Sequence, residues 1–180
     1  MANPGVVLFG GEHCTGEKVR FFNDTYVLDT VKHSWTLYTS PSAPPPRAAH
    51  ASTVHGNSLF VFGGEFASPR QTQFKHFRDL WSLNLPTMEW TQLSPPKGNA
   101  PAARSGARML TVKNTLLIFG GFIDPAGRQT KYLNDLTILD LDAEILEWKK
   151  VVLPLGSLEP SPRSAFRWEQ VPAVPPGPTP

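Results

Sequence analysis

The sequence predicts an all-β protein built from about three repeated antiparallel sheets of four strands each. Two observations lead to this fold class. The 180 residues include 19 prolines, about twice the usual share, and no segment has a helical period long enough to trust. The apolar runs 6–9, 59–62 and 116–119 each end in a glycine pair, so the pattern returns after about 55 residues.

Four further marks accompany each glycine pair in the same order. An arginine in a proline-rich approach precedes the apolar strand of the second and third units. An aspartate follows the glycines, then an alternating strand, and then a tryptophan that opens a short last strand. The marks are Arg47, Arg104 and Arg163; Asp24, Asp79 and Asp135; the strands 25–29, 80–84 and 136–140; and Trp35, Trp90 and Trp148.

Each mark has a structural reading. The apolar runs lack alternation, so we expect strands buried on both faces. The glycine pair permits a crowded or left-handed exit, and the tryptophan seals one sheet against the next. Because the arginine and the aspartate recur in every unit, we expect them to cap strand ends or to form ion pairs between units, and not to be catalytic. An Asp79→Ala substitution should therefore lower stability without selectively removing ligand binding.

These residues resemble the kelch repeat, a β-propeller blade, over residues 6 to about 166. The segments 62–69, 79–81, 104–106 and 119–122 are most similar to the kelch domain-containing protein 4 group. The resemblance implies a partial kelch-type β-propeller. Its expected parts are kelch repeats over 5–166, with a blade lacking its first strand at 5–40, blades at 41–98 and 99–156, and the start of a further blade at 157–168, followed by a proline-rich disordered tail at 169–180.

Three blades are fewer than the roughly four to eight that close a propeller. We therefore expect a fragment of a larger ring that needs its remaining blades or self-association. Two alternatives remain open. Residues 163–168 could supply the missing first strand of the first unit in an open arc, or two arcs of three blades could join, because unpaired apolar faces invite partners.

The connections between the glycine pair and the aspartate, 12–23, 65–78 and 122–134, are expected to be long irregular loops. In the kelch family these connections line one mouth of the ring. Their formal charges sum to about +3, which favours an acidic or phosphorylated peptide as ligand. The alternative is that the aromatic side chains pack under their own loops and the charges are merely solvated. The predicted partner-binding residues are Arg70, Lys75, His76, Arg78, Arg128, Lys131, Phe66, Phe74 and Phe122.

No catalytic set is recognisable, so a non-enzymatic module that binds a protein or peptide is predicted, without cofactor or metal. The only cysteine, Cys14, stands beside His13, and neighbouring residues of an extended segment point to opposite sides. Two alternatives are a propeller enzyme whose site lies in missing blades and a weak nucleic-acid binder. The net charge of +2 argues little for nucleic acid. No membrane span or signal peptide is recognisable, which predicts an intracellular protein, cytoplasmic or nuclear.

Overall fold

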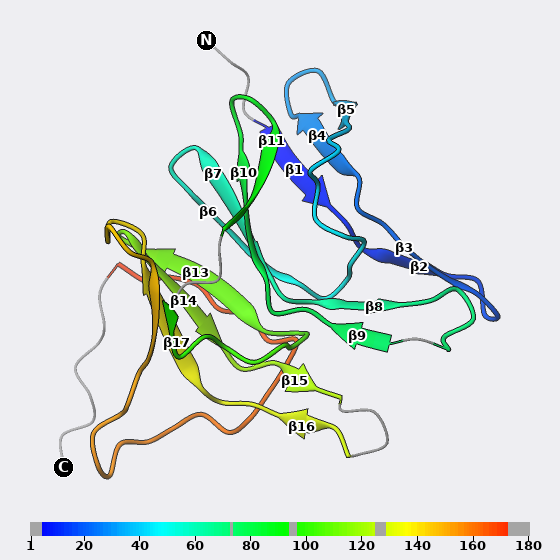
Figure 1. Cartoon of the computed structure of the whole chain (residues 1–180). Helices are drawn as coiled ribbons and strands as arrows, with labels where there is room; N and C mark the ends of the chain where they lie inside the picture. The colour runs from blue at the N-terminus through cyan, green and yellow to red at the C-terminus, as the bar shows by residue number, and fades with distance from the viewer. Residues whose placement is uncertain (1–4, 73, 94–96, 125–128, 173–180) are drawn as a thin grey trace.

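A computed structural model describes residues 5–72, 74–93, 97–124 and 129–172. Within these ranges the chain forms β-strands and no helix, which confirms the predicted fold class. Three main sheets follow one another along the chain and fan out side by side, and each sends a two-stranded hairpin out at the same end (Figure 1). We call the sheets the first, second and third blade.

The first blade has three strands in the order β1-β4-β5. It lacks the inner strand that precedes the Gly-Gly strand in the other blades, as the sequence predicts. One edge of β1 therefore has no strand beside it among the described residues. Its elements are β1 (Gly5–Phe9), β4 (Thr25–Asp29) and β5 (Ser34–Tyr38), with the hairpin strands β2 (Glu12–Cys14) and β3 (Val19–Phe21).

The second blade has the predicted four strands, in the order β11-β10-β7-β6, and all of its neighbouring strands are antiparallel. The strand that follows the arginine, β6, forms the inner edge. The elements are β6 (Ala51–His55), β7 (Ser58–Phe62), β10 (Leu80–Asn84) and β11 (Glu89–Leu93), with the hairpin strands β8 (Glu65–Ala67) and β9 (Phe74–His76).

The third blade has five strands, where four were expected. The additional strand, β12 (Lys97–Gly98), comes from the end of the segment assigned to the second blade and pairs in parallel with β18. It therefore ties the connection between the blades to the outer edge of the third. The other elements are β13 (Arg108–Val112), β14 (Thr115–Phe119), β17 (Leu136–Asp140) and β18 (Glu147–Lys150), with the hairpin strands β15 (Phe122–Ile123) and β16 (Lys131–Tyr132).

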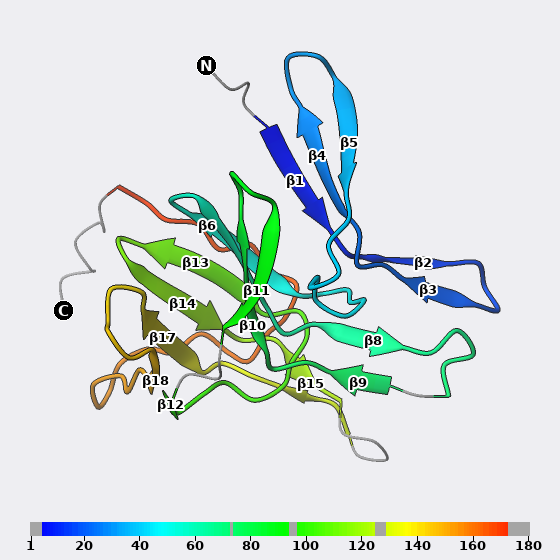
Figure 2. The same cartoon turned by 45° about the horizontal axis from the view of Figure 1, so that its top comes forward.

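The connections 12–23, 65–78 and 122–134 are not the irregular loops that the sequence predicts. Each contains a short antiparallel hairpin, and the three hairpins lie in a row (Figure 2). The first two are joined directly, because the Val19 amide donates to the Pro69 carbonyl at 3.3 Å. The hairpins satisfy backbone groups that an irregular loop would leave to water, so the described residues of this face carry regular β-structure.

The core lies between the blades. Val61, Leu83 and Trp90 of the second blade pack with Phe9 of the first, and the Phe9 and Trp90 ring centroids are 4.7 Å apart. The next interface repeats this arrangement, with Trp148 of the third blade 5.9 Å from the Phe62 ring. Two of the three tryptophans therefore seal neighbouring blades as predicted.

Trp35, the third tryptophan of the repeat, is 52% exposed. Burial on both faces holds for most of β7, whose last four residues are buried, whereas β1 buries only Phe9. The same sequence pattern thus meets a different environment in the first blade, because no described blade precedes it.

The glycine pairs leave the apolar strands in the left-handed region, as the sequence predicts. Gly63 and Gly64 have φ values of +67° and +92°, and a Cβ on Gly64 would lie 2.6 Å from the Ala48 carbonyl oxygen. The segment before β6, which contains Ala48, thus lies directly against the glycine pair that follows β7. Only glycine allows so close an approach here.

Within the described ranges no strand lies beside the free edge of β1, and residues 157–172, which include the expected start of a further blade, contain no strand. They pack instead on the third blade, where the Phe166 and Phe119 ring centroids are 5.6 Å apart. Of the predicted tail, residues 173–180 lie outside the described residues. In the described part of the chain, no helix is long and apolar enough to cross a membrane.

Candidate functional site

Arg47 joins the first and second blades. Its amide donates to the Phe22 carbonyl at 3.0 Å, and its own carbonyl accepts from the Gly11 amide at 2.9 Å, both in the first blade. Its fully buried side chain reaches into the second blade, where the guanidinium binds both carboxylate oxygens of Asp79 at 2.7 and 2.9 Å and the Gly63 carbonyl at 3.0 Å. The main chain of Arg47 is thus fixed to the first blade, while its side chain binds the second blade.

Arg104 repeats this bracket between the second and third blades, with Asp135 at 2.6 and 2.8 Å and the Gly120 carbonyl at 3.0 Å. Burial alone would raise the pKa of Asp79 and of Asp135, but the hydrogen bonds and charge of their arginines hold both below the ordinary value. These recurrent residues therefore have the structural role that the sequence predicts.

The hairpins bring most of the predicted aromatic residues together. Phe66 packs on Phe21 of the preceding hairpin at 5.4 Å between centroids. The His76 ring lies 5.0 Å from Phe74 and 5.6 Å from Phe122 of the next hairpin. Phe66 and Phe122 therefore hold neighbouring hairpins together, whereas the Phe74 side chain is 51% exposed.

His76 connects the second and third hairpins by hydrogen bonds. The Asp124 amide donates to its Nε2 at 3.0 Å, so the ring proton is on Nδ1, which donates to the Ser105 hydroxyl at 2.8 Å. Burial lowers the pKa of His76, although the charge of Asp124 acts against this. Because Ser105 is fully buried, this His-Ser pair cannot present a nucleophile to a substrate.

The predicted basic residues lie at several places on the arc, and the described ones are exposed. Lys75 and Lys131 are exposed on the second and third hairpins, and Arg70 is exposed between β8 and β9. Arg78 lines a cavity with Leu93 and Trp148, between the second and third blades. Arg128 lies outside the described residues.

The structure adds Arg20 to the basic residues of the hairpins. Arg20, Lys75 and Lys131 each stand four residues before the repeated aspartate, so they occupy equivalent positions, and all three are exposed. The cationic groups of Arg20 and Lys75 lie 4.9 and 4.8 Å from the centroids of Phe22 and Phe77. The constant offset from the aspartate was the sequence signal that could have found this row. Tyr132, which follows Lys131 and is 52% exposed, was also missed.

Two buried polar atoms have no hydrogen-bond partner among the described residues, His50 Nδ1 and Glu65 Oε2. Burial, with the charge of Arg47, lowers the pKa of His50 to about 4. Burial raises the pKa of Glu65, while a hydrogen bond from Ser105 acts against the rise. Burial therefore disfavours the charged form of both groups.

His50 predicts a loss of stability in mild acid. The unfolded chain binds a proton at His50 below about 6.5, whereas the folded chain resists this to about 4. The free energy of unfolding should therefore fall by about 2 kcal/mol between pH 7.5 and pH 5. Urea titrations at the two pH values measure this difference.

The matched variant is His50→Phe, because Phe166 stands at the same distance after its own arginine. In this variant the fall in the free energy of unfolding between pH 7.5 and pH 5 should be smaller by about 2 kcal/mol. Glu65 contributes in the opposite direction in both proteins, so its effect cancels when the variant is compared with the wild type. An unchanged pH dependence in the variant would contradict a buried neutral His50.

Blades that fan about a common side, bracketed by buried Arg-Asp pairs and sealed by tryptophan, define a partial β-propeller of repeated units (Figure 1). Residues 1–170 match the family model of the KLHDC2/KLHL20/DRC7 Kelch-repeats domain. The chain therefore belongs to the kelch-repeat family, as the sequence predicts.

Individual relatives agree with the family. The chain is 41% identical over 106 residues to Kelch domain-containing protein 2 of Bos taurus, covering 57% of this chain and 24% of the relative. It is 30% identical over 173 residues to the Dynein alpha chain, flagellar outer arm, of Chlamydomonas reinhardtii, covering 92% of this chain and 4% of the relative. The chain thus spans a quarter or less of these curated relatives.

A solved structure shares the fold. The structure of YjhT superposes with a TM-score of 0.64 at 19% identity, and the match covers 86% of this chain and 50% of YjhT. The arc therefore corresponds to about half of that chain.

Proposed function

We propose that this chain is a non-catalytic protein-interaction module that binds an acidic or phosphorylated peptide across its hairpin face. The observation that carries the proposal is the row of equivalent basic residues, Arg20, Lys75 and Lys131, one on each hairpin. A row of cations in register fits a ligand that carries several negative charges along an extended chain. Within the kelch-repeat family, membership of this chain in the kelch domain-containing protein 4 group stays a prediction.

Exposed aromatic side chains on the same hairpins support an amphipathic ligand. Phe74 and Tyr132 are 51% and 52% exposed. The Phe122 ring packs beside His76 and Tyr132, with its centroid 5.6 Å from that of His76 and 6.1 Å from that of Tyr132. Aromatic anchors contribute much of the binding energy of peptide interfaces. The expected ligand therefore carries aromatic or large apolar side chains between its acidic groups.

The paired substitution Lys75→Glu/Lys131→Glu tests this proposal. It places like charges opposite the ligand on two hairpins, so we expect the affinity for an acidic peptide to fall about tenfold or more. The probe is a fluorescein-labelled peptide rich in glutamate and phosphoserine around an aromatic residue, measured by fluorescence anisotropy.

The control Lys32→Glu/Lys113→Glu makes the same change of charge on exposed turns at the opposite end of the strands. It should leave the affinity within about twofold. An equal loss in both variants would reduce the effect to net charge and contradict a site on the hairpins. Tighter binding of single-stranded DNA than of the peptide, with a steep loss in salt, would favour the nucleic-acid alternative.

A further inference from the structure

The arc ends in two open faces that are the two halves of its own repeated interface. On the first blade, Val6, Leu8 and Trp35 are 52%, 44% and 52% exposed. Their equivalents in the second blade are Leu59, Val61 and Trp90, which are 7%, 0% and 4% exposed because the first blade covers them. The face of the first blade is thus built to be covered by a preceding blade.

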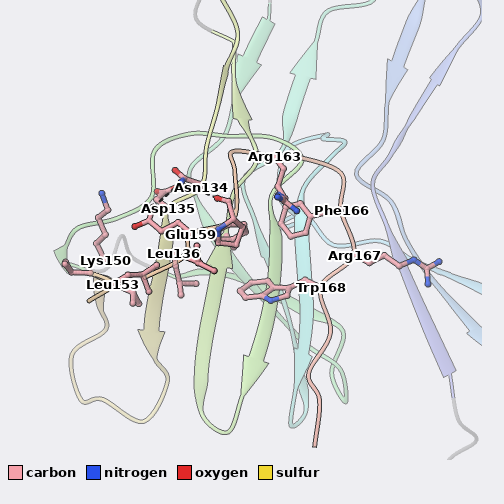
Figure 3. A pocket seen from close by; sticks show the side chains of 15 residues that line it. Asn134, Asp135, Leu136, Lys150, Leu153, Glu159, Arg163, Phe166, Arg167 and Trp168 are labelled. Carbon is pink, nitrogen blue, oxygen red and sulfur yellow. Dashed lines mark hydrogen bonds between the residues drawn. The ribbon is translucent and has the colours of Figure 1, made fainter. Parts of the chain in front are cut away.

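The opposite face belongs to the third blade. Phe119 stands at the position of Phe9 and Phe62, which receive the tryptophans of the following blades. A cavity of about 710 Å³ opens beside it, lined also by Leu136, Arg163 and Trp168 (Figure 3). A cavity at this position, walled in part by Phe119, Leu136 and Trp168, can receive a tryptophan such as Trp35.

The Arg-Asp bracket is also divided between the two ends. Arg163 has the pose of its equivalents, because its amide donates to the Leu133 carbonyl at 3.0 Å and its carbonyl accepts from the Gly121 amide at 2.8 Å. Its Nε donates to the carbonyl two residues earlier, at Ser161, as Arg47 and Arg104 do at Pro45 and Ala102. Yet Arg163 pairs with no carboxylate in the described part of the chain.

Asp24 is the matching half. The Gly10 amide donates to its carbonyl at 3.2 Å, the same bond that holds Asp79 and Asp135 at 3.3 Å. Its carboxylate forms no ion pair within the described ranges. Arg163 and Asp24 therefore have the main-chain positions of a bracket pair, one at each end of the arc. Their opposite charges make the two ends complementary.

The charges and the strand edge agree with this division. The groove on the first blade is lined by the acidic Asp24 and Glu12. The cavity on the third blade is lined by three basic residues, Lys150, Arg163 and Arg167, and by two acidic ones, Asp135 and Glu159. Strands β6 and β13 begin four residues after Arg47 and Arg104. The same offset after Arg163 gives residues 167–171, while the free edge of β1 lacks an inner strand.

We propose that two copies of this chain join head to tail, so that each first blade covers the third blade of the other. Arg163 of each copy binds Asp24 and the Gly10 carbonyl of the other, Trp35 packs on Phe119, and residues 167–171 add an inner strand to β1. Two such contacts close a two-fold ring. The size agrees with the match to YjhT, since the arc covers 50% of that chain and two arcs would cover its whole length.

Light scattering after gel filtration of the 180-residue chain tests the proposal. The wild type should have twice the 19.8 kDa mass of one chain. Arg163→Glu and Trp35→Lys should each raise the dissociation constant of the dimer about a hundredfold, with unchanged circular dichroism. The double variant Asp24→Arg/Arg163→Glu restores opposite charges in both contacts and should recover part of the dimer.

The matched controls are Arg70→Glu and Phe74→Lys, which change exposed hairpin residues in the same way and should leave the dimer intact. A monomeric wild-type chain overturns the proposal. A dimer that withstands both Arg163→Glu and Trp35→Lys, or an assembly larger than two chains, also overturns it. No peptide ligand enters this experiment, so its result is independent of the proposed function.

Discussion

Replacing Asp79 with alanine is expected to lower the free energy of unfolding by about 3–5 kcal/mol. The substitution leaves the guanidinium of Arg47, whose side chain is fully buried, without its two bonds to the carboxylate at 2.7 and 2.9 Å. An unpaired buried charge is the costly product, and the Trp81 indole also loses its acceptor at 2.7 Å. Urea titration at pH 7 measures the difference, because the carboxylate is ionised there in both states.

The repeat offers a matched control in Asp24, the equivalent aspartate of the first blade, which has no arginine partner among the described residues. At protein concentrations low enough to keep the chains apart, Asp24→Ala should cost less than about 1 kcal/mol. Equal losses of stability in Asp79→Ala and Asp24→Ala would contradict the view that the buried Arg47–Asp79 pair causes the loss in Asp79→Ala. Binding that disappears in Asp79→Ala at unchanged stability would instead give this residue a functional role.

Trp148→Ala is expected to destabilise the chain by about 3–5 kcal/mol, because it removes a large side chain that is only 2% exposed. The indole fills the interface between the second and third blades, where it meets Phe62 and the buried Leu116 and Leu139. The cavity that remains lies between two rigid sheets, which cannot easily close it. Thermal and urea unfolding both measure the loss.

Trp35→Ala is the control for Trp148→Ala, because it makes the same substitution at the equivalent position of a blade that no described blade covers. In a single chain its effect should be about half as large, about 2 kcal/mol, since 52% of the residue is already exposed. A large loss for Trp35→Ala in dilute protein would mean that another part of the same chain covers the first blade.

Much of the fold could be predicted from residues that act locally. Gly63 and Gly64 have positive φ values, and a Cβ on Gly64 would lie 2.6 Å from the Ala48 carbonyl oxygen, so the glycine pair marks the strand end in the sequence itself. The hairpins were missed because their strands have only two or three residues, too few to show an alternating pattern.

The candidate site could be predicted only in part. Lys75 and Lys131 lie on the hairpin face, but Arg78 lines the cavity between the second and third blades. Phe66, which is predicted to contact a ligand, packs against Phe21, 45 residues earlier in the sequence. Which aromatic side chains remain exposed depends on neighbouring hairpins, and the sequence of one hairpin does not contain that information.

The sequence by itself determined the all-β class, the number of repeated units and the identity of the recurrent arginine, aspartate and tryptophan, because strand patterns and glycine turns are local requirements of the backbone. Only the tertiary structure decided the partners. Arg47 and Asp79 are 32 residues apart, and they meet because the backbone of the first blade holds the arginine over the second. Trp35, Trp90 and Trp148 carry the same sequence mark but differ in burial, since burial depends on whether a neighbouring blade covers that face.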